Sequence, residues 1–360
     1  MYSDSDLDAA VTAGAMTPEA AAALRNFVAE SAASPLVDEE HFRLLTGFND
    51  IFVAIAAAIL LVAVAWIGDA VRFSDQWEGP TPFSGLFVAA TAWGLAEFFT
   101  LKRRMALPSI ILLLAFVGGV FVTIGAAVGM MFPDAMNEAG DGRTAAMIGA
   151  VSAAVAAGAA RLHWRRFRVP ITIAAGAAAV VVLALALIAS AIGESPATKD
   201  ALLAAALVAG VGVFLFAMRW DSSDPTRQTR RSDVAFWLHL LSAPLIVHPV
   251  FSLLGLTDGN ATILEAMVVV IVYVMLGLTA LAIDRRALLV SALAYVLWAL
   301  SDLFKRFGAV ELNFALTAFI IGSALLLLSA FWHSARRKVV EPLPAGLRAR
   351  LPVMDRPLTA

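Results

Sequence analysis

Ten apolar runs of about twenty residues, separated by short charged segments, dominate this chain. An α-helix needs about 20 apolar residues to cross roughly 30 Å of hydrocarbon, so each run is long enough to span a membrane. Hydrophobic residues make up 61% of the sequence and charged residues only 15%, which is not the balance of a soluble fold. The runs occupy residues 49–68, 83–101, 107–132, 144–160, 169–192, 201–218, 234–254, 263–283, 287–304 and 312–333. We therefore expect an all-α, polytopic membrane helix bundle with about ten transmembrane helices.

The distribution of Lys and Arg tests this count of spans independently of hydropathy. Basic residues accumulate in short loops on the cytoplasmic side of a membrane. If the amino terminus is cytoplasmic, the inner loops hold Lys102, Arg103, Arg104, Arg161, Arg165, Arg166, Arg168, Arg219, Arg227, Arg230, Arg231, Arg285 and Arg286. The outer loops hold Arg72, Arg143, Lys199, Lys305 and Arg306. Removing any one span would move the clusters downstream of it to the opposite face, so we expect ten spans with both termini cytoplasmic.

Two segments lie outside the predicted bundle of residues 49–335. Residues 1–48 are expected to form a cytosolic helical segment, in which Thr17 is a candidate N-cap followed by an early proline and glutamate. This segment starts with acidic residues and has no apolar core of the required length, so no cleavable signal peptide is expected. Residues 336–360 begin with the basic cluster at 336–338 and contain four prolines, which predicts an extended cytosolic tail.

The seventh predicted span is unusual because it contains two prolines and two histidines. Pro244, near its middle, cannot donate a backbone hydrogen bond, so a carbonyl one turn earlier needs another partner inside the membrane. Tyr273 and Tyr295 fall near the centres of the next two spans, away from the interfaces where tyrosine collects. We predict a substrate-binding pocket near the midplane built from Pro244, His248, Tyr273 and Tyr295. The alternative is that these polar groups bond neighbouring backbones in a packed core.

Ionisable side chains within spans are costly and often functional. Four of them are candidates for a proton-linked or ion-linked role, namely Glu97, His239, Glu265 and Asp302. The three carboxylates lie within a few residues of a predicted span end, so the alternative is an interfacial carboxylate that reaches water. His239 and His248 are about half a turn out of phase on a straight helix, and the chain has no cysteine. We therefore expect no metal site and no cofactor.

Residues 161–168, with the sequence RLHWRRFR, form the most distinctive short string of the predicted inner loops. Arginines interleaved with aromatic rings are typical of the headgroup level of a membrane, where the rings occupy the interface and the charges reach lipid phosphates. The residues expected to contact anionic phospholipids are Arg161, Trp164, Arg165, Arg166 and Arg168. General anchoring in the interface is the alternative to a specific lipid or ligand site.

The amino-terminal helix start resembles that of a known group of proteins. Thr17-Pro18-Glu19-Ala20 with Leu24, followed by compact spans rich in Ala, Leu and Val, resembles an uncharacterised family of bacterial inner-membrane proteins catalogued only as a domain of unknown function. The resemblance covers the amino segment and the first spans. It implies a multi-pass protein of the bacterial inner membrane and transfers no activity and no site residues.

Two functions remain open on the sequence. A net charge of −2 gives no field to recruit nucleic acid, and no catalytic motif such as G-x-S-x-G, H-E-x-x-H or a P-loop occurs, so we expect neither a nucleic-acid partner nor an enzyme. Ten spans divide into two halves of five, and an odd number inverts the second half, as in many secondary transporters. We favour a small-solute transporter or permease, with a non-catalytic membrane scaffold or assembly subunit as the alternative.

Overall fold

The computed structural model describes residues 7, 10–24, 48–72, 79–132, 142–225, 227, 229–253, 263–286, 288, 289, 293, 297, 313–349 and 351–353. Within these residues the chain forms helices joined by turns and contains no strand, which confirms the all-α class. The chain divides into two compact units, Met1–Arg43 with Asp355–Ala360 and Leu44–Met354.

The described part of the first unit contains the predicted helix start. Residues 18–24 are helical, and the Thr17 hydroxyl oxygen accepts a hydrogen bond from the Ala20 backbone N–H at 3.1 Å. This side-chain bond satisfies one of the backbone donors that a helix leaves free at its amino end. The N-cap predicted at Thr17 is therefore confirmed.

The second unit holds the membrane-spanning helices. Its elements are α3 (Phe48–Asp69), α4 (Pro82–Ala96), the π-helix η1 (Glu97–Lys102), α5 (Ala106–Gly129), α6 (Arg143–Phe167), α7 (Ile171–Ile192), α8 (Pro196–Ser222), α9 (Arg230–Leu253), α10 (Ile263–Ile283), α12 (Asn313–Ala330), α13 (Trp332–Val340) and α14 (Ala345–Arg348). Seven helices of the described part are long and apolar enough to cross a membrane, or eight if the bent pair α12–α13 is one span. These helices fit a multi-pass integral membrane protein. Most of the predicted span 287–304 lies outside the described residues, so the count of ten stays a prediction.

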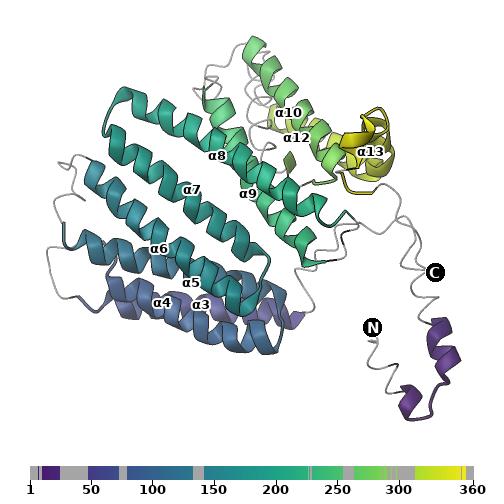
Figure 1. Ribbon diagram of the computed structural model, residues 1–360, viewed down its shortest axis with the longest axis horizontal. Coiled ribbons are helices and arrows are strands. Elements are labelled where there is room, and N and C mark those ends of the chain that lie inside the picture. Colours follow the sequence, from purple (N-terminus) through teal and green to yellow (C-terminus); the bar gives the residue numbers. More distant parts are fainter. Residues whose placement is uncertain are drawn as a thin grey trace. The chain divides into compact units, whose positions relative to one another are not determined.

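Helices that follow one another in the sequence also pack against one another from α3 to α9 (Figure 1). Glycine allows the closest approaches, because helices in lipid associate through backbone contact at small residues. A Cβ added at Gly85 of α4 would lie 2.4 Å from the Gly119 carbonyl oxygen of α5, and one at Gly210 of α8 would lie 2.8 Å from the Leu245 carbonyl carbon of α9. Side chains at these glycines would therefore force the helices apart.

The pairing of α5 with α6 through small residues is only partly as the sequence suggests. Gly125 of α5 does face α6, where an added Cβ would meet the Ser152 hydroxyl at 3.2 Å. Gly149 of α6 instead faces Ala186 of α7, and Gly158 is exposed. The small residues of α6 thus serve two neighbours.

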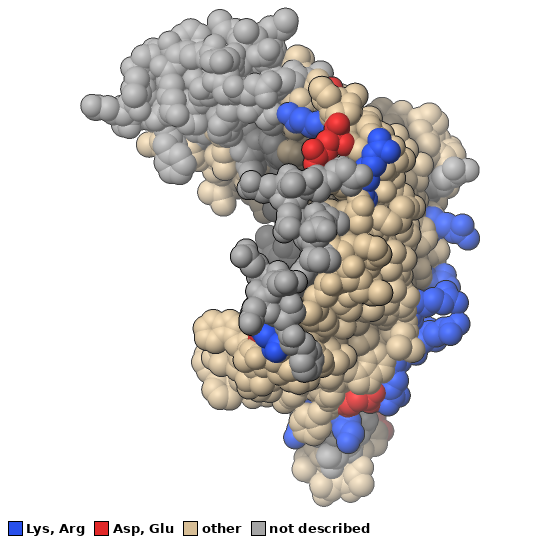
Figure 2. All heavy atoms as spheres, turned by 90° about the vertical axis from the view of Figure 1, so that its left-hand side faces the viewer, with Lys and Arg blue, Asp and Glu red and all other residues tan. Residues whose placement is uncertain are grey.

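Uncharged surface dominates the face of the molecule drawn in Figure 2, where the visible Lys and Arg lie toward the margins of the described part. Large apolar side chains are exposed along the spans, for example Ile59 of α3 at 66% and Leu326 of α12 at 74%. In water such exposure would be unfavourable, whereas in a bilayer these side chains contact acyl chains.

Two local expectations are wrong, because helices occur in residues that were expected to lie outside them. Helix α6 continues to Phe167, so the arginine-rich string forms its last two turns instead of a loop. The tail expected to be extended contains the end of α13 and the short helix α14. Helix α9 includes Pro244 and Pro249, and the last span ends at Ala330 in a bend of 75°.

Candidate functional site

The helical form of residues 161–167 sends the predicted lipid-contact residues to different places. Phe167 and His163 are buried against Trp93 and Phe116. Arg166 forms an ion pair instead: two of its guanidinium nitrogens lie 2.9 and 2.7 Å from the carboxylate oxygens of Glu97.

The remaining residues of this group lie on the outer faces of the helix end. Arg161 and Arg165 are exposed, whereas Trp164 and Arg168 lie together, with the Arg168 Cζ 5.9 Å from the Trp164 ring centroid. Arg168 ends the helix with a φ of 56°, a left-handed conformation that is uncommon outside glycine. Of the five residues expected to contact anionic phospholipids, Trp164 and Arg168 therefore lie against each other, and the lipid contact itself stays a prediction.

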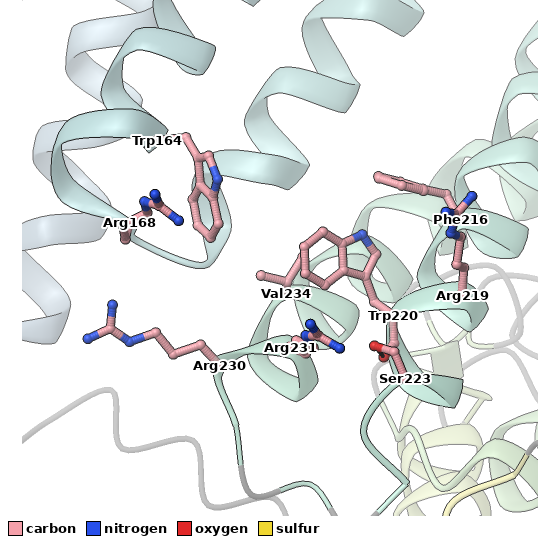
Figure 3. Close-up of a pocket in the computed structure, with 9 residues that line it drawn as sticks. All are labelled: Trp164, Arg168, Phe216, Arg219, Trp220, Ser223, Arg230, Arg231 and Val234. Carbon is pink, nitrogen blue, oxygen red and sulfur yellow. Dashed lines mark hydrogen bonds between the residues drawn. The ribbon is translucent and has the colours of Figure 1, made fainter.

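Trp164 and Arg168 form one wall of an open pocket of about 800 Å³ between the ends of three helices. The lining residues are Trp164, Arg168, Phe216, Arg219, Trp220, Ser223, Arg230, Arg231 and Val234, which we call the basic–aromatic pocket. Figure 3 shows the α6 residues on one side, the α8 residues on the opposite side, and Val234 of α9 between the two tryptophan rings. The carboxyl ends of α6 and α8 and the amino end of α9 therefore converge on one space.

The pocket is strongly positive. It contains four guanidinium groups and no carboxylate lines it. Within the described residues, Arg168, Arg219, Arg230 and Arg231 form no ion pair, although Arg230 interacts electrostatically with the nearby Asp233. Like charges that share a space repel one another, and an anion between them removes this penalty. The tryptophan rings add flat apolar walls that can pack on an organic part of a ligand.

A buried ionic group directly behind the pocket joins α8, α9 and the end of α10. The Asp221 and His239 side chains are 0% exposed and Arg285 is 3% exposed. Arg285 donates to the two Asp221 carboxylate oxygens at 2.5 and 3.3 Å and to the Ser232 carbonyl at 3.1 Å. His239 Nε2 lies 2.9 Å from Asp221 Oδ2. We call Asp221, Ser232, His239 and Arg285 the Asp221 cluster.

The Asp221 cluster determines which ring nitrogen of His239 carries a hydrogen. An ionised carboxylate only accepts hydrogen bonds, so the hydrogen between the two side chains must sit on Nε2. His239 Nδ1 is buried and has no partner among the described residues. His239, a candidate proton-linked residue on sequence grounds, therefore has a defined carboxylate partner in Asp221.

A second buried group continues from the first toward α13. The Asp284 carboxylate accepts hydrogen bonds from Arg227 Nη1 at 2.8 Å and from Trp332 Nε1 at 2.7 Å. Arg336 Nε lies 3.9 Å from the same carboxylate, and its other nitrogens donate to the Pro352 and Val353 carbonyls at 2.6 and 3.3 Å. We call Arg227, Asp284, Trp332 and Arg336 the Asp284 cluster.

Charge balance determines the ionisation of the Asp284 cluster. Burial alone would raise the pKa of the Asp284 carboxyl, but the charges of Arg227 and Arg336 and the Trp332 hydrogen bond outweigh it and hold this pKa below its ordinary value. Burial lowers the pKa of the Arg227 guanidinium. Asp284 therefore stays ionised at neutral pH and ties the turn after α10 to the α8–α9 connection and to α13.

The Asp221 cluster adjoins the pocket along the chain. Asp221 directly follows Trp220, and Ser232 directly follows Arg231, so these two cluster residues each share a helix turn with a pocket residue. A buried ion pair with several hydrogen bonds restricts the helices that carry it. The ends of α8 and α9 are therefore held in register while their arginines project into the open space.

The residues predicted to form a midplane pocket are not seen to converge in the described part of the chain. Pro244 and His248 are exposed on α9, whereas Tyr273 packs between buried clusters that contain Ala243 and Val247 of the same helix. The Tyr273 hydroxyl is buried without a hydrogen-bond partner among the described residues.

Several other predicted site residues cannot be placed. Tyr295 and Asp302 lie outside the described residues, as does the side chain of Glu265. The midplane pocket and the ion-linked roles of these residues therefore stay predictions. Within the described residues, no group of His, Asp and Glu is arranged to hold a metal ion.

The sequence did not lead us to the buried residues Asp221, Arg285, Asp284, Arg227 and Arg336. We expected Arg227 and Arg285 in loops and Arg336 in the tail, because charged residues at span ends normally face water. A signal was present in the order of charges: Asp221 and Asp284 are acidic residues at the ends of two spans that are otherwise flanked by arginines. A carboxylate at such a level indicates that some of the arginines are paired inside the protein.

No protein-family model matches this chain, and searches of curated proteins and of solved structures find no similar protein. The family resemblance expected from the amino-terminal motif therefore stays a prediction.

Proposed function

We propose that this protein is a membrane carrier that recognises a small anionic ligand at the basic–aromatic pocket. The observation that carries the proposal is the convergence of Arg168, Arg219, Arg230 and Arg231 on one space without an ion-paired carboxylate. Guanidinium groups bind carboxylates and phosphates through two parallel hydrogen bonds, so the ligand class is an organic acid or a phosphate. The Asp221 cluster behind the pocket supports this role, because a fixed arrangement of donors loses less entropy on binding.

The membrane and its orientation belong to the same proposal. Multi-pass helices and the distribution of arginines favour the inner membrane of a bacterium with both termini in the cytoplasm, which puts the pocket on the cytoplasmic side. Reporter fusions at Gln228 and at Gly193 test this assignment. Gln228 should report a cytoplasmic position and Gly193 a periplasmic one, and the reverse pattern would contradict it.

A thermal-shift experiment tests anion recognition directly. The pocket variant carries Arg219→Gln and Arg230→Gln, and the control variant carries Arg161→Gln and Arg165→Gln, which remove the same charge from exposed positions outside the pocket. A ligand that binds only the folded form and is present at a concentration of about 100 times its Kd stabilises the protein by about 2.7 kcal/mol. Inorganic phosphate or a dicarboxylate should stabilise the unchanged protein and the control variant but not the pocket variant. Equal stabilisation of all three would refute the proposal.

The predicted midplane site is a separate part of the carrier proposal. Replacing His248 and Tyr295 by Phe removes its polar groups while keeping similar volume. If solute crosses the membrane through this site, the double variant should bind at the basic–aromatic pocket as before but lose transport in proteoliposomes. Unchanged transport would remove the midplane site and leave the pocket untouched.

A non-catalytic scaffold is the second candidate, and the two buried clusters favour it. Buried ion pairs fix one arrangement of helices, which suits an assembly subunit as well as a carrier. A scaffold predicts that no anion stabilises the protein and that the pocket variant behaves as the control variant does. The thermal-shift comparison therefore separates the two candidates.

A further inference from the structure

One face of α8 connects the basic–aromatic pocket to the lipid-facing surface. Val208, Val211, Leu215 and Phe216 are exposed by 72, 43, 62 and 41% of their surface. Spacings of three and four residues place Val208, Val211, Leu215 and Arg219 on one side of the helix, and Phe216 lies about 100° round the helix from Leu215. An apolar track therefore leads along α8 directly to a guanidinium of the pocket.

The track reaches the pocket at Phe216. Phe216 belongs both to the track and to the pocket lining, and it lies beside Arg219 and Trp220 in Figure 3. The Phe216 and Trp220 rings stand edge to face, with centroids 6.2 Å apart. A ligand held by the arginines can thus place an apolar portion on Phe216 without crossing a polar barrier.

These two features together define an amphiphilic ligand. We infer that the basic–aromatic pocket binds the phosphate of an anionic membrane phospholipid, with one acyl chain lying along Val208, Val211 and Leu215. This inference rests on the proposed recognition of an anion and specifies its source. Tryptophan and arginine residues normally occupy the headgroup level of a bilayer, which is the depth at which a lipid phosphate is found.

The basic lining fits the phosphate of a phospholipid. A phospholipid phosphodiester carries one negative charge on two non-ester oxygens, which a guanidinium can bind through two parallel hydrogen bonds, and its two ester oxygens are further acceptors. Arginines from three helix ends line the pocket, so the phosphate can be contacted from more than one of them. The volume of about 800 Å³ lies within the range of 300–1,000 Å³ that is usual for small-molecule pockets.

Lipid competition in detergent tests the inference with the pocket and control variants defined above. Purified full-length protein is mixed with equal amounts of phosphatidylglycerol and phosphatidylcholine, and bound lipid is counted by native mass spectrometry. In detergent no charged bilayer surface acts on the protein, so only arginines that contact the phosphate directly should matter; at about 1 kcal/mol, or about fivefold, for each lost contact, losing two should weaken phosphatidylglycerol binding on the order of 30-fold in the pocket variant. The control variant should retain its preference within about threefold, because its arginines do not line the pocket.

The outcomes separate this inference from the proposed function. Equal loss in the pocket and control variants would overturn the inference, because general surface charge would then explain the lipid preference. Inorganic phosphate that stabilises the protein through the pocket while phosphatidylglycerol binds no better than phosphatidylcholine would also overturn it, yet would leave anion recognition in place. If neither the binding of phosphate nor the binding of phosphatidylglycerol depends on the pocket arginines, the inference and the proposed function both fail. Gel filtration and melting temperature establish that each variant is folded.

Discussion

Arg285 should be among the most sensitive positions of this protein, and replacing it by Met tests how the buried clusters work. The substitution keeps an unbranched apolar stem but removes the charged guanidinium. Asp221 then keeps only His239 as a partner in a place where its side chain is 0% exposed, and the Ser232 carbonyl loses its donor. Breaking a buried pair by removing one partner destabilises a protein by about 3–5 kcal/mol, because an uncompensated charge stays behind.

The expected change is large enough to measure in detergent. Because the entropy of unfolding is about 2.1 cal/mol/K per residue, one kcal/mol corresponds to about 1.3 °C in a chain of 360 residues, so Arg285→Met should lower the melting temperature by about 4–7 °C. Fluorescence-detected gel filtration after heating gives this temperature. Arg161→Met is the matched control. Arg161 is exposed and forms no ion pair within the described residues, so its loss should change the melting temperature by no more than about 2 °C.

A double variant identifies the cause of the loss. Adding Asp221→Asn to Arg285→Met removes the charge that the single variant leaves unpaired, so the double variant should be more stable than Arg285→Met alone. If Arg285→Met unfolds at the same temperature as Arg161→Met, the buried pair does not stabilise the fold. If the double variant is less stable than both single variants by the sum of their losses, the two residues do not act as a pair.

Three further predictions concern other parts of the molecule. Gly85→Ala should destabilise the protein by about 1–3 kcal/mol through overpacking against α5. Gly94→Ala is the control and should be neutral, because a Cβ added there meets nothing within 4 Å. Equal melting temperatures of the two variants would contradict the close contact at Gly85. Glu97→Gln breaks the pair with Arg166, but both groups are well exposed, so its melting temperature should stay within about 2 °C of the unchanged protein. The folded protein lowers the pKa of Asp284, so the stability that this carboxylate contributes is complete above its ordinary pKa of 3.8 and is lost as the pH falls toward the lower pKa of the folded state. The Asp284→Asn variant should be less stable than the unchanged protein at neutral pH, and its stability should fall less as the pH is lowered.

The membrane class was predictable because it depends on quantities that add along the chain. Each apolar run is long enough to cross a bilayer whatever its neighbours are, so seven of the predicted spans appear as helices of the required length and hydropathy. The Thr17 cap was predictable because it is local: the backbone N–H that its side chain binds lies only three residues further along the chain. Local rules failed where a helix could continue at little cost, as at the end of α6, where arginine and aromatic residues are acceptable helix formers.

The candidate site was only partly predictable, and Arg165, Arg166 and Arg168 show why. The three arginines are almost adjacent in sequence and were assigned one role. The helix rotates successive residues by about 100°, so one is exposed, one binds Glu97 and one enters the pocket. The number of charges in the sequence is the same for each of the three arginines. Only the direction in which each side chain points distinguishes their roles.

The sequence by itself determined that this protein is an all-α chain with many helices fit to cross a membrane, because helix length and hydropathy are properties of contiguous residues. Tertiary structure decided which charges face outward and which are paired inside. Asp221 and Arg285 are separated by 64 residues along the chain, yet their side chains lie in hydrogen-bond contact. Such a pair depends on how α8, α9 and α10 pack, and the same packing brings the pocket arginines of three helices to one place. The physical reason is that burial and pairing are properties of distances between helices, which hydropathy along one helix does not contain.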